Sequence, residues 1–368
     1  MSYEMPTIIL FGEGCLATLP DLLAPYRKIA FFHGRASYVP NAQRMDALLQ
    51  GKDILHIADI APEPEVRHLQ ECTEQLQSFA PECVLALGGG SVLDIAKGAA
   101  FCAMQSTSVE GLLSASGGHF ADSLPVIAIP TTAGTGSEVT PFAVFWNHGE
   151  KKKYSFGYRE LFPAHALVDP ELTYSMPPIV TACTGMDAFT QACESYWNNN
   201  HNPTSDAYAL EALSLMLSAL PKAVEDGADA SARHDVMLGS LRAGQAFSNT
   251  RTAACHSISY PMTLYFGVTH GQAVGVTLPE VLLLDAQAMP NRIPDFCEAL
   301  GASSMGEAAE KIRDMMRASG LCTRLSELGI DRAGIDIIVE HGFTPERMSN
   351  NPYAFTAESL RTMLLHLL

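Results

Sequence analysis

The sequence lacks the cysteine spacing that a disulfide scaffold or a thiolate zinc site would need. Its nine cysteines are scattered, odd in number and without a CxxC pair, which argues against both kinds of site. Basic residues are also scarce, with 23 lysines and arginines against 40 acidic residues and a formal net charge of -17. This excess of negative charge excludes a general affinity for nucleic acid or for an anionic membrane.

Long apolar runs and a basic leader are missing as well. No stretch approaches the roughly 20 uninterrupted apolar residues of a membrane helix, and the start MSYEMPTIIL has no basic residue, unlike a signal peptide. The scattered cysteines fit a reducing compartment. The sequence therefore predicts a soluble, cytoplasmic protein without a nucleic-acid or membrane partner.

The chain is rich in apolar residues and long enough for more than one core. Hydrophobic residues make up 47% and charged residues 17% of its 368 residues, a composition typical of a folded globule. At about 150 residues for a domain, the length predicts two or three domains, and we take two.

The first half alternates short apolar runs with helical patterns, which is typical of a parallel sheet with crossover helices. Strands are expected at residues 28–33, 54–57, 84–87, 126–129 and 166–168, and crossover helices at residues 65–80 and 92–104. After Pro178 only helical patterns follow, at residues 179–197, 206–220, 232–248 and 305–319. This change predicts an α/β domain over residues 1–178 and an all-helical domain over residues 179–368.

A glycine-rich loop joins a predicted strand to a predicted helix in ECVLALGGGSVLDIAK. Gly88, Gly89, Gly90 and Ser91 leave the backbone open at the helix N-terminus, where N–H groups and the helix dipole favour a phosphate. The alternative is a tight turn without a ligand, because the run is not the GxGxxG fingerprint of dinucleotide binding. By itself the loop indicates phosphate and leaves nicotinamide open.

A second loop, IPTTAGTGSE, also follows a predicted strand and holds four hydroxyl residues and two glycines in ten positions. Thr131, Thr132, Thr135 and Ser137 offer hydroxyls to a ribose or phosphate at the carboxyl end of a parallel sheet. A loop without a ligand is the alternative here too. Two such loops at successive strand ends weaken that alternative.

The helical half contains oxygen and nitrogen donors with the spacing of metal ligands. Asp187 and Gln191 are four residues apart, which places a carboxylate and an amide oxygen on one face of a helix. His256 and His270 follow, 14 residues apart. One carboxylate with two imidazoles suits a divalent ion, Fe2+ or Zn2+, with positions open for substrate. Each histidine alone is more often a satisfied helix residue than a ligand.

Four ordered motifs together resemble the iron-containing, or group III, alcohol dehydrogenase family. They are GGGSVLDIAK, PTTAGTGSEVT, the GMDAFTQA helix and the two histidines, and the resemblance spans nearly the whole chain. It implies an α/β N-terminal dinucleotide-binding domain and an all-α C-terminal domain that binds the metal and carries the catalytic residues. It also implies a nicotinamide-dependent alcohol dehydrogenase or aldehyde reductase that forms a homodimer or a larger homo-oligomer.

The resemblance further implies the site residues. Cofactor-binding residues would be Gly88 to Ser91 and Asp94 at the pyrophosphate, Thr131, Thr132, Thr135 and Ser137 in the second loop, and Lys153 and Leu172 near the ribose and nicotinamide. The metal ligands would be Asp187, His256 and His270. Family members usually have His where Gln191 stands, so the fourth ligand is either the amide oxygen of Gln191 or absent.

Two further positions depart from the family pattern. Tyr260 stands where many members have a histidine near the reacting group, and its phenol belongs either to a proton relay or to the packing. Arg251 stands where the family usually has a small residue. A guanidinium beside a metal needs an anion or a carboxylate, so Arg251, with Thr250 and Thr252, is a candidate clamp for an anionic substrate; the alternative is a salt bridge.

The run SNTRTAACHSISYPMT and the glutamine of the metal helix resemble the phosphonoacetaldehyde reductase branch of the family. That branch reduces its aldehyde to 2-hydroxyethylphosphonate, which implies a small anionic aldehyde as substrate. A reductase of neutral aldehydes, a lyase similar to dehydroquinate synthase and a metal-free binding protein are the alternatives. Asp187 favours the dehydrogenase over the lyase, whose metal carboxylate is a glutamate.

The end of the first strand predicted from the pattern indicates the choice of cofactor. Enzymes that select NAD usually carry an acid there for the ribose 2′-hydroxyl, whereas a missing acid and a nearby arginine suit a 2′-phosphate. Here the position is Gly34, followed by Arg35 and Ser37. The sequence therefore predicts NADP(H) in preference to NAD(H).

Overall fold

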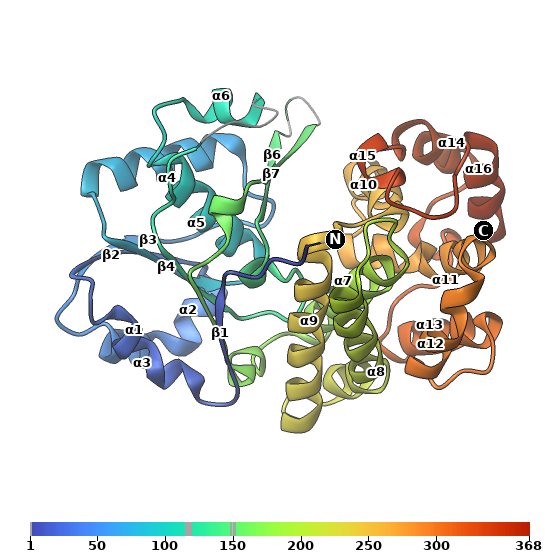
Figure 1. The fold of residues 1–368 in the computed structure, drawn as a ribbon, viewed down its shortest axis with the longest axis horizontal. Helices are drawn as coiled ribbons and strands as arrows, with labels where there is room; N and C mark the ends of the chain where they lie inside the picture. Colours follow the sequence, from blue (N-terminus) through green and yellow to red (C-terminus); the bar gives the residue numbers. More distant parts are fainter. Residues whose placement is uncertain (1, 115–119, 148, 150–151) are drawn as a thin grey trace. The chain divides into compact units, whose positions relative to one another are not determined.

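The computed structural model describes residues 2–114, 120–147, 149 and 152–368, and the chain divides into two compact units (Figure 1). The first, here called the sheet unit, consists of Met5–Thr132 and Gly136–Ser175. The second, here called the helical unit, consists of Met176–Leu368 with Met1–Glu4 and Ala133–Thr135. The sequence predicts a single boundary after residue 178, whereas the second unit also takes two short pieces from the first half.

The sheet unit is built on six parallel strands in the order β1-β8-β5-β4-β2-β3. The strands are β1 (Ile8–Phe11), β2 (Lys28–His33), β3 (Asp53–Ile57), β4 (Cys83–Gly88), β5 (Val126–Pro130) and β8 (His165–Val168). All five strands predicted from apolar runs are present, and β1 is additional. Every residue of β4 and β5 is buried, as expected for parallel strands covered on both faces.

Side chains on the two faces of these strands belong to two separate apolar clusters. Phe32 and Ala86 belong to one cluster and Phe31 and Leu85 to the other, because successive residues of a strand point to opposite faces. The helices of the unit are α1 (Leu19–Leu23), α2 (Arg35–Tyr38), α3 (Ala42–Leu48), α4 (Val66–Phe79), α5 (Gly90–Cys102) and α6 (Val109–Ser114). The predicted crossover helices correspond to α4 and α5.

An antiparallel hairpin of β6 (Phe142–Asn147) and β7 (Lys152–Gly157) forms a second, small sheet that the sequence did not predict. Phe145 on β6 and Phe156 on β7 lie with their ring centroids 5.4 Å apart. Phe156 lies 5.9 Å from the ring of Phe101 on α5. Aromatic packing on α5 therefore helps to fix the hairpin, together with a parallel bridge between Trp146 and Glu65.

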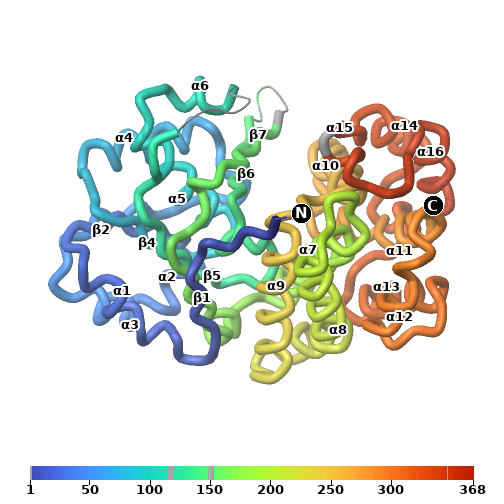
Figure 2. Tube along the Cα trace, viewed as in Figure 1, coloured from blue at the N-terminus to red at the C-terminus, as the bar shows by residue number. Residues whose placement is uncertain are grey.

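The helical unit contains only helices and loops, so the predicted fold class is confirmed. Its helices are α7 (Pro178–Trp197), α8 (Pro203–Glu225), α9 (Ala230–Thr250), α10 (Ala254–Phe266), α11 (His270–Ala288), α12 (Ile293–Ala299), α13 (Met305–Ala318), α14 (Arg332–His341), α15 (Pro345–Met348) and α16 (Ala357–His366). Helix α7 packs against α8, α9 and α11 (Figure 2). It is buried almost throughout from Thr181 to Trp197, so polar residues on it lie in a mostly apolar interior.

One helix in the described part of the chain, α8, is long and apolar enough to cross a membrane. A core helix of a soluble protein passes the same test, and α8 packs against α7 and α9.

Candidate metal centre and cofactor loops

The first glycine loop lies between the end of β4 and the start of α5. Gly89 precedes the helix with an extended backbone (φ −77°, ψ −174°) and no side-chain cap, so the N–H groups at the start of α5 have no side-chain acceptor at this position. A Cβ atom on Gly88 would lie 2.6 Å from the side chain of Val92. The turn therefore needs glycine for close packing, and it presents backbone donors of the kind that bind phosphate.

The second loop begins beside the first. The N–H of Thr131 donates to the carbonyl oxygen of Gly88 at 3.0 Å, and a Cβ on Gly89 would lie 3.2 Å from the side chain of Thr132. Thr135, farther along the loop, belongs to the helical unit by the division of the chain. The two loops are thus neighbours because β4 and β5 are neighbours in the sheet.

Asp94 and Ser137, both expected to bind the cofactor, are bonded to each other. The hydroxyl of Ser137 donates to Oδ1 of Asp94 at 2.5 Å, and the N–H of Val144 donates to Oδ2 at 2.9 Å. Nearby, Lys97 Nζ donates to the carbonyl oxygen of Ser137 at 2.9 Å, and burial lowers the pKa of Lys97 to about 8. These bonds fasten α5, the second loop and the hairpin together.

The residues expected at the adenosine and nicotinamide ends differ in their surroundings. Arg35 is exposed at the first position of α2, directly after Gly34. The hydroxyl of Ser37 contacts the carbonyl oxygens of Gly34 and Leu87, each at 2.9 Å.

The two residues expected near the nicotinamide also differ from each other. Lys153 Nζ lies 5.1 Å from the ring centroid of Trp146, and Leu172 is buried in an apolar cluster. Arg35 alone among these side chains combines exposure with positive charge at the end of β2.

The predicted metal ligands Asp187, His256 and His270 come together from three helices, α7, α10 and α11. Oδ1 of Asp187 lies 3.2 Å from Nε2 of His256 and 3.7 Å from Nε2 of His270. All three ligand atoms lie within 4.8 Å of one another. Asp187 and His256 are buried, whereas the side chain of His270 is 38% exposed. One side of the cluster is therefore accessible.

Gln191 lies one helical turn after Asp187 on α7 and is 4% exposed. Its Oε1 atom is buried and has no hydrogen-bond partner among the described residues. An unsatisfied buried carbonyl oxygen costs about 1–3 kcal/mol, and a cation would remove that cost. The orphaned oxygen and the three converging donors together fit one divalent ion.

A glycine allows the close approach of α11 to α7. A Cβ on Gly271 would lie 1.8 Å from the carbonyl oxygen of Cys183, so only glycine permits this backbone contact. Gly271 directly follows His270, the first residue of α11. The contact therefore fixes where His270 stands relative to Asp187, four residues after Cys183 on α7.

Glu194 was missed by the sequence analysis, although it lies seven residues after Asp187 and so on the same face of α7. Its carboxylate is fully buried, accepts from the N–H groups of Ala253 at 2.7 Å and His256 at 3.2 Å, and lies 2.6 Å from Nδ1 of His256. Burial lowers the pKa of His256, but the charges of Glu194 and Asp187 raise it more, to about 9. Glu194 thus caps the start of α10 and orients His256 with Nε2 toward Asp187.

Of the candidate catalytic side chains, Tyr260 lies beside this cluster. The ring of Tyr260 lies nearly parallel to that of His270, with 6.4 Å between centroids. Burial raises the pKa of Tyr260 and the charge of Arg347 opposes the shift, so the phenol keeps its proton at neutral pH. Thr252 is buried, whereas Arg251 ends α9 with φ +67° and an exposed side chain.

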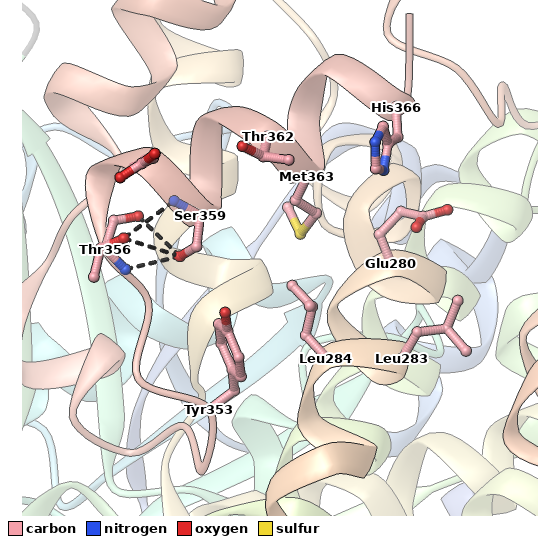
Figure 3. Close-up of a pocket in the computed structure, with 10 residues that line it drawn as sticks. Glu280, Leu283, Leu284, Tyr353, Thr356, Ser359, Thr362, Met363 and His366 are labelled. Carbon is pink, nitrogen blue, oxygen red and sulfur yellow. Dashed lines mark hydrogen bonds between the residues drawn. The ribbon is translucent and has the colours of Figure 1, made fainter.

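A groove of about 410 Å³ opens elsewhere in the helical unit, between α11 and α16 (Figure 3). Leu283, Leu284 and Met363 form its apolar part, and Glu280 and His366 lie at one end. None of the residues that line it belongs to the metal cluster. The groove therefore does not mark the candidate active site.

Comparison with known proteins agrees with this geometry. The family model for iron-containing alcohol dehydrogenase matches residues 6–170, and the model for the C-terminal part of the Fe-containing alcohol dehydrogenase family matches residues 181–368. Long-chain-alcohol dehydrogenase 1 of Geobacillus thermodenitrificans is 35% identical over 81% of this chain and 78% of its own length. Sulfoacetaldehyde reductase of Bilophila wadsworthia is 31% identical over 83% of this chain and 82% of its own length.

A solved structure is similar over the whole chain. Sulfoacetaldehyde reductase from Bifidobacterium kashiwanohense, in complex with NAD+, has a TM-score of 0.93 and 33% identity, covering 100% of this chain and 98% of its own. These matches bear out the family assigned from the four motifs and favour a dehydrogenase over a lyase. The chain belongs to the iron-containing alcohol dehydrogenase family and is an oxidoreductase of the alcohol dehydrogenase class.

Proposed function

We propose that this enzyme reduces a small anionic aldehyde, such as phosphonoacetaldehyde to 2-hydroxyethylphosphonate, with a nicotinamide cofactor and one divalent metal, Fe2+ or Zn2+. The observation that carries the chemistry is the cluster of Asp187, His256 and His270, whose ligand atoms lie within 4.8 Å of one another. Similarity to two sulfoacetaldehyde reductases, at 33% and 31% identity, supports an anionic substrate.

The residues of the metal centre would have two roles, which are to bind the ion and to supply a proton. Asp187, Gln191, His256 and His270 would hold a divalent ion, which when bound polarises the carbonyl group and stabilises the alkoxide that develops as hydride arrives. Glu194, whose carboxylate lies 2.6 Å from Nδ1 of His256, would keep a proton on that nitrogen. Tyr260, protonated and next to His270, is our candidate donor of the proton that the alkoxide needs.

The sheet unit would hold the cofactor. The backbone donors from Gly88 to Ser91 would bind the pyrophosphate at the start of α5, and the hydroxyls of the second loop would contact the sugar or phosphate. Asp94 and Ser137 would act by fixing that loop to α5, given their mutual hydrogen bond of 2.5 Å. We retain Lys153 and Leu172 as proposed neighbours of the ribose and nicotinamide.

We further propose that the enzyme prefers NADP(H) to NAD(H). Gly34 leaves no carboxylate at the end of β2, and Arg35 is exposed beside it, an arrangement that suits a 2′-phosphate. The hydroxyl of Ser37 is already bonded to two carbonyl oxygens, so Arg35 would supply the main contact. If so, Arg35→Ala should raise KM for NADPH severalfold and leave that for NADH nearly unchanged.

The test of the proposed function is a steady-state assay of metal-reconstituted enzyme with each cofactor. Phosphonoacetaldehyde and sulfoacetaldehyde are compared with propionaldehyde, a neutral aldehyde of similar size. A higher kcat/KM for the two anionic aldehydes supports the proposal. Equal or better turnover of propionaldehyde refutes the anionic substrate, and no NAD(P)H oxidation with any aldehyde or metal refutes the reductase.

A reductase of neutral aldehydes is the second candidate. Long-chain-alcohol dehydrogenase 1 at 35% identity and an NAD-dependent methanol dehydrogenase of Bacillus methanolicus at 30% identity are named for uncharged substrates. The assay above separates the two candidates directly, since it compares aldehydes of similar size and different charge.

We also propose a cytoplasmic location and a homodimeric or larger assembly. The nine cysteines are all free thiols, which suits a reducing compartment. Light scattering coupled to size-exclusion chromatography would test the assembly, and a mass equal to the single chain would refute it.

A further inference from the structure

Arg347 on the short helix α15 lies next to the metal centre, far in sequence from the metal-ligand motifs. Its guanidinium carbon is 5.1 Å from the ring centroid of Tyr260, and its Nε donates to the hydroxyl of Thr252 at 3.2 Å. The ring of Tyr260 in turn lies parallel to that of His270. One aromatic ring therefore separates this guanidinium from a predicted metal ligand.

The segment around Arg347 is fastened to the helices of the centre by hydrogen bonds on both sides. Before it, the N–H of Thr344 donates to the hydroxyl of Ser257, which donates to the carbonyl oxygen of Gly342 at 2.6 Å. After it, Nδ2 of Asn350 donates to the carbonyl oxygen of Thr252 at 2.9 Å. Ser257 directly follows His256 on α10. The hydrogen bonds of Ser257 therefore fix the segment that carries Arg347 relative to the predicted metal ligand His256.

Asn199, which follows the end of α7, holds the same segment from another side. Nδ2 of Asn199 donates to the carbonyl oxygens of Ser349 and Asn351, each at 3.0 Å. Tertiary hydrogen bonds therefore hold the backbone on both sides of Arg347 in place.

Among the side chains that the structure describes, no carboxylate forms an ion pair with Arg347. Arg292, by contrast, pairs with Asp206 at 2.8 Å, and Arg313 pairs with Glu280. Among the described residues, the only hydrogen bond of Arg347's side chain runs from Nε to Thr252, so both Nη groups keep their donors. A half-buried guanidinium that lies over an aromatic ring and turns two Nη groups to no described acceptor is suited to bind a phosphonate or sulfonate in a forked contact.

We propose that Arg347 binds the anionic group of the aldehyde substrate and is the main determinant of its charge preference. This inference rests on the proposed reduction of an anionic aldehyde. Arg347 meets the geometric requirement better than Arg251, because the side chain of Arg251 is exposed where the chain leaves α9. Since Tyr260 lies between Arg347 and His270, an aldehyde with only a short chain between carbonyl and anion suits the site.

The test compares Arg347→Gln with the wild type on phosphonoacetaldehyde, sulfoacetaldehyde and propionaldehyde. A charge-assisted pair is worth about 1.5–3 kcal/mol, so kcat/KM for the anionic aldehydes should fall by about 10- to 100-fold, mainly through KM. The fall for propionaldehyde should be at least about tenfold smaller. Arg324→Gln, an exposed arginine in the same unit, is the matched control, and Arg347→Lys should restore part of the loss.

Calorimetric titration of the metal-loaded protein with 2-hydroxyethylphosphonate gives a readout that needs no turnover. Weaker binding to Arg347→Gln than to the wild type and to Arg324→Gln supports the inference. Unchanged binding, or an equal loss of kcat/KM on charged and neutral aldehydes, overturns it while the reductase stands. If the wild type reduces no aldehyde, the proposed function fails, and the titration still decides whether Arg347 binds the anion.

Discussion

The two cofactor loops and the metal centre are built in different ways. The loops are continuous stretches, Gly88 to Ser91 and Thr131 to Ser137, and they meet because β4 and β5 are adjacent in the sheet. The metal centre collects single side chains from α7, α10 and α11, which are separated by long stretches of sequence. A local motif is sufficient for the loops, whereas the centre exists only when three helices pack correctly.

The difference also concerns which atoms bind. The first loop would use backbone N–H groups, which a side-chain substitution does not remove, and the second loop would add several neighbouring hydroxyls, each of which can be lost singly. The centre uses buried carboxylate, amide and imidazole groups, and removal of one such group leaves the others unsatisfied. Substitutions should therefore cost more at the metal centre than at the loops.

The largest effect should follow from Asp187→Ala. Asp187 approaches both histidines and would carry the only carboxylate in the ligand set, so its loss should release the ion and lower kcat by about a thousandfold. Metal analysis and turnover measure this effect. Asp314→Ala, an exposed aspartate on α13, is the control; metal retained at one ion per chain in Asp187→Ala would contradict the assignment.

The next effect should come from Gly271→Ala. The new Cβ would lie 1.8 Å from the carbonyl oxygen of Cys183, so α11 must move away from α7 at a cost on the order of 3 kcal/mol. Chemical denaturation and metal content should both change. Gly306→Ala on α13 is the control, because a Cβ there meets only Ser304 Oγ at 3.9 Å; equal stability of the two variants would show that the contact is not essential.

A moderate effect should follow from Glu194→Gln, which keeps the shape but removes the charge beside His256. Loss of such an outer partner typically lowers metal affinity by about 10- to 100-fold. Competition with a chelator of known affinity measures the change. If the affinity stayed the same, Glu194 would serve only to cap α10.

The smallest effect should come from Gly88→Ala in the first loop. A Cβ 2.6 Å from the side chain of Val92 should shift the turn and raise Kd for the nicotinamide cofactor by about tenfold, which corresponds to about 1.4 kcal/mol. Fluorescence titration with NADPH measures it. Metal content should remain that of the wild type. A parallel loss of metal would show that the cofactor loops and the metal centre do not respond independently to substitution.

The sequence predicted most of the fold because apolar runs and helical periods are local signals. It missed β1, which pairs with β8, a strand more than 150 residues later. It also missed the hairpin of β6 and β7, whose stability depends on aromatic packing against α5. Both omissions concern elements defined by distant contacts.

The site was predictable to a similar degree. Motif spacing indicated Asp187, His256 and His270, and the structure brings them together. Glu194 could have been found from its seven-residue spacing to Asp187 on one helix face. No spacing signal pointed to Arg347, because contacts between distant residues, among them the hydrogen bonds of Thr344 and Asn350, bring α15 beside α10.

We propose that this chain reduces an aldehyde with a metal ion bound by Asp187, Gln191, His256 and His270. The most direct test is NADPH oxidation with phosphonoacetaldehyde by chelator-stripped enzyme, before and after addition of one equivalent of Fe2+ or Zn2+. We expect no turnover in the stripped wild type, recovery on metal addition, and no recovery in Asp187→Ala. Full turnover by the metal-free protein, or recovery in Asp187→Ala equal to that of the wild type, would contradict it.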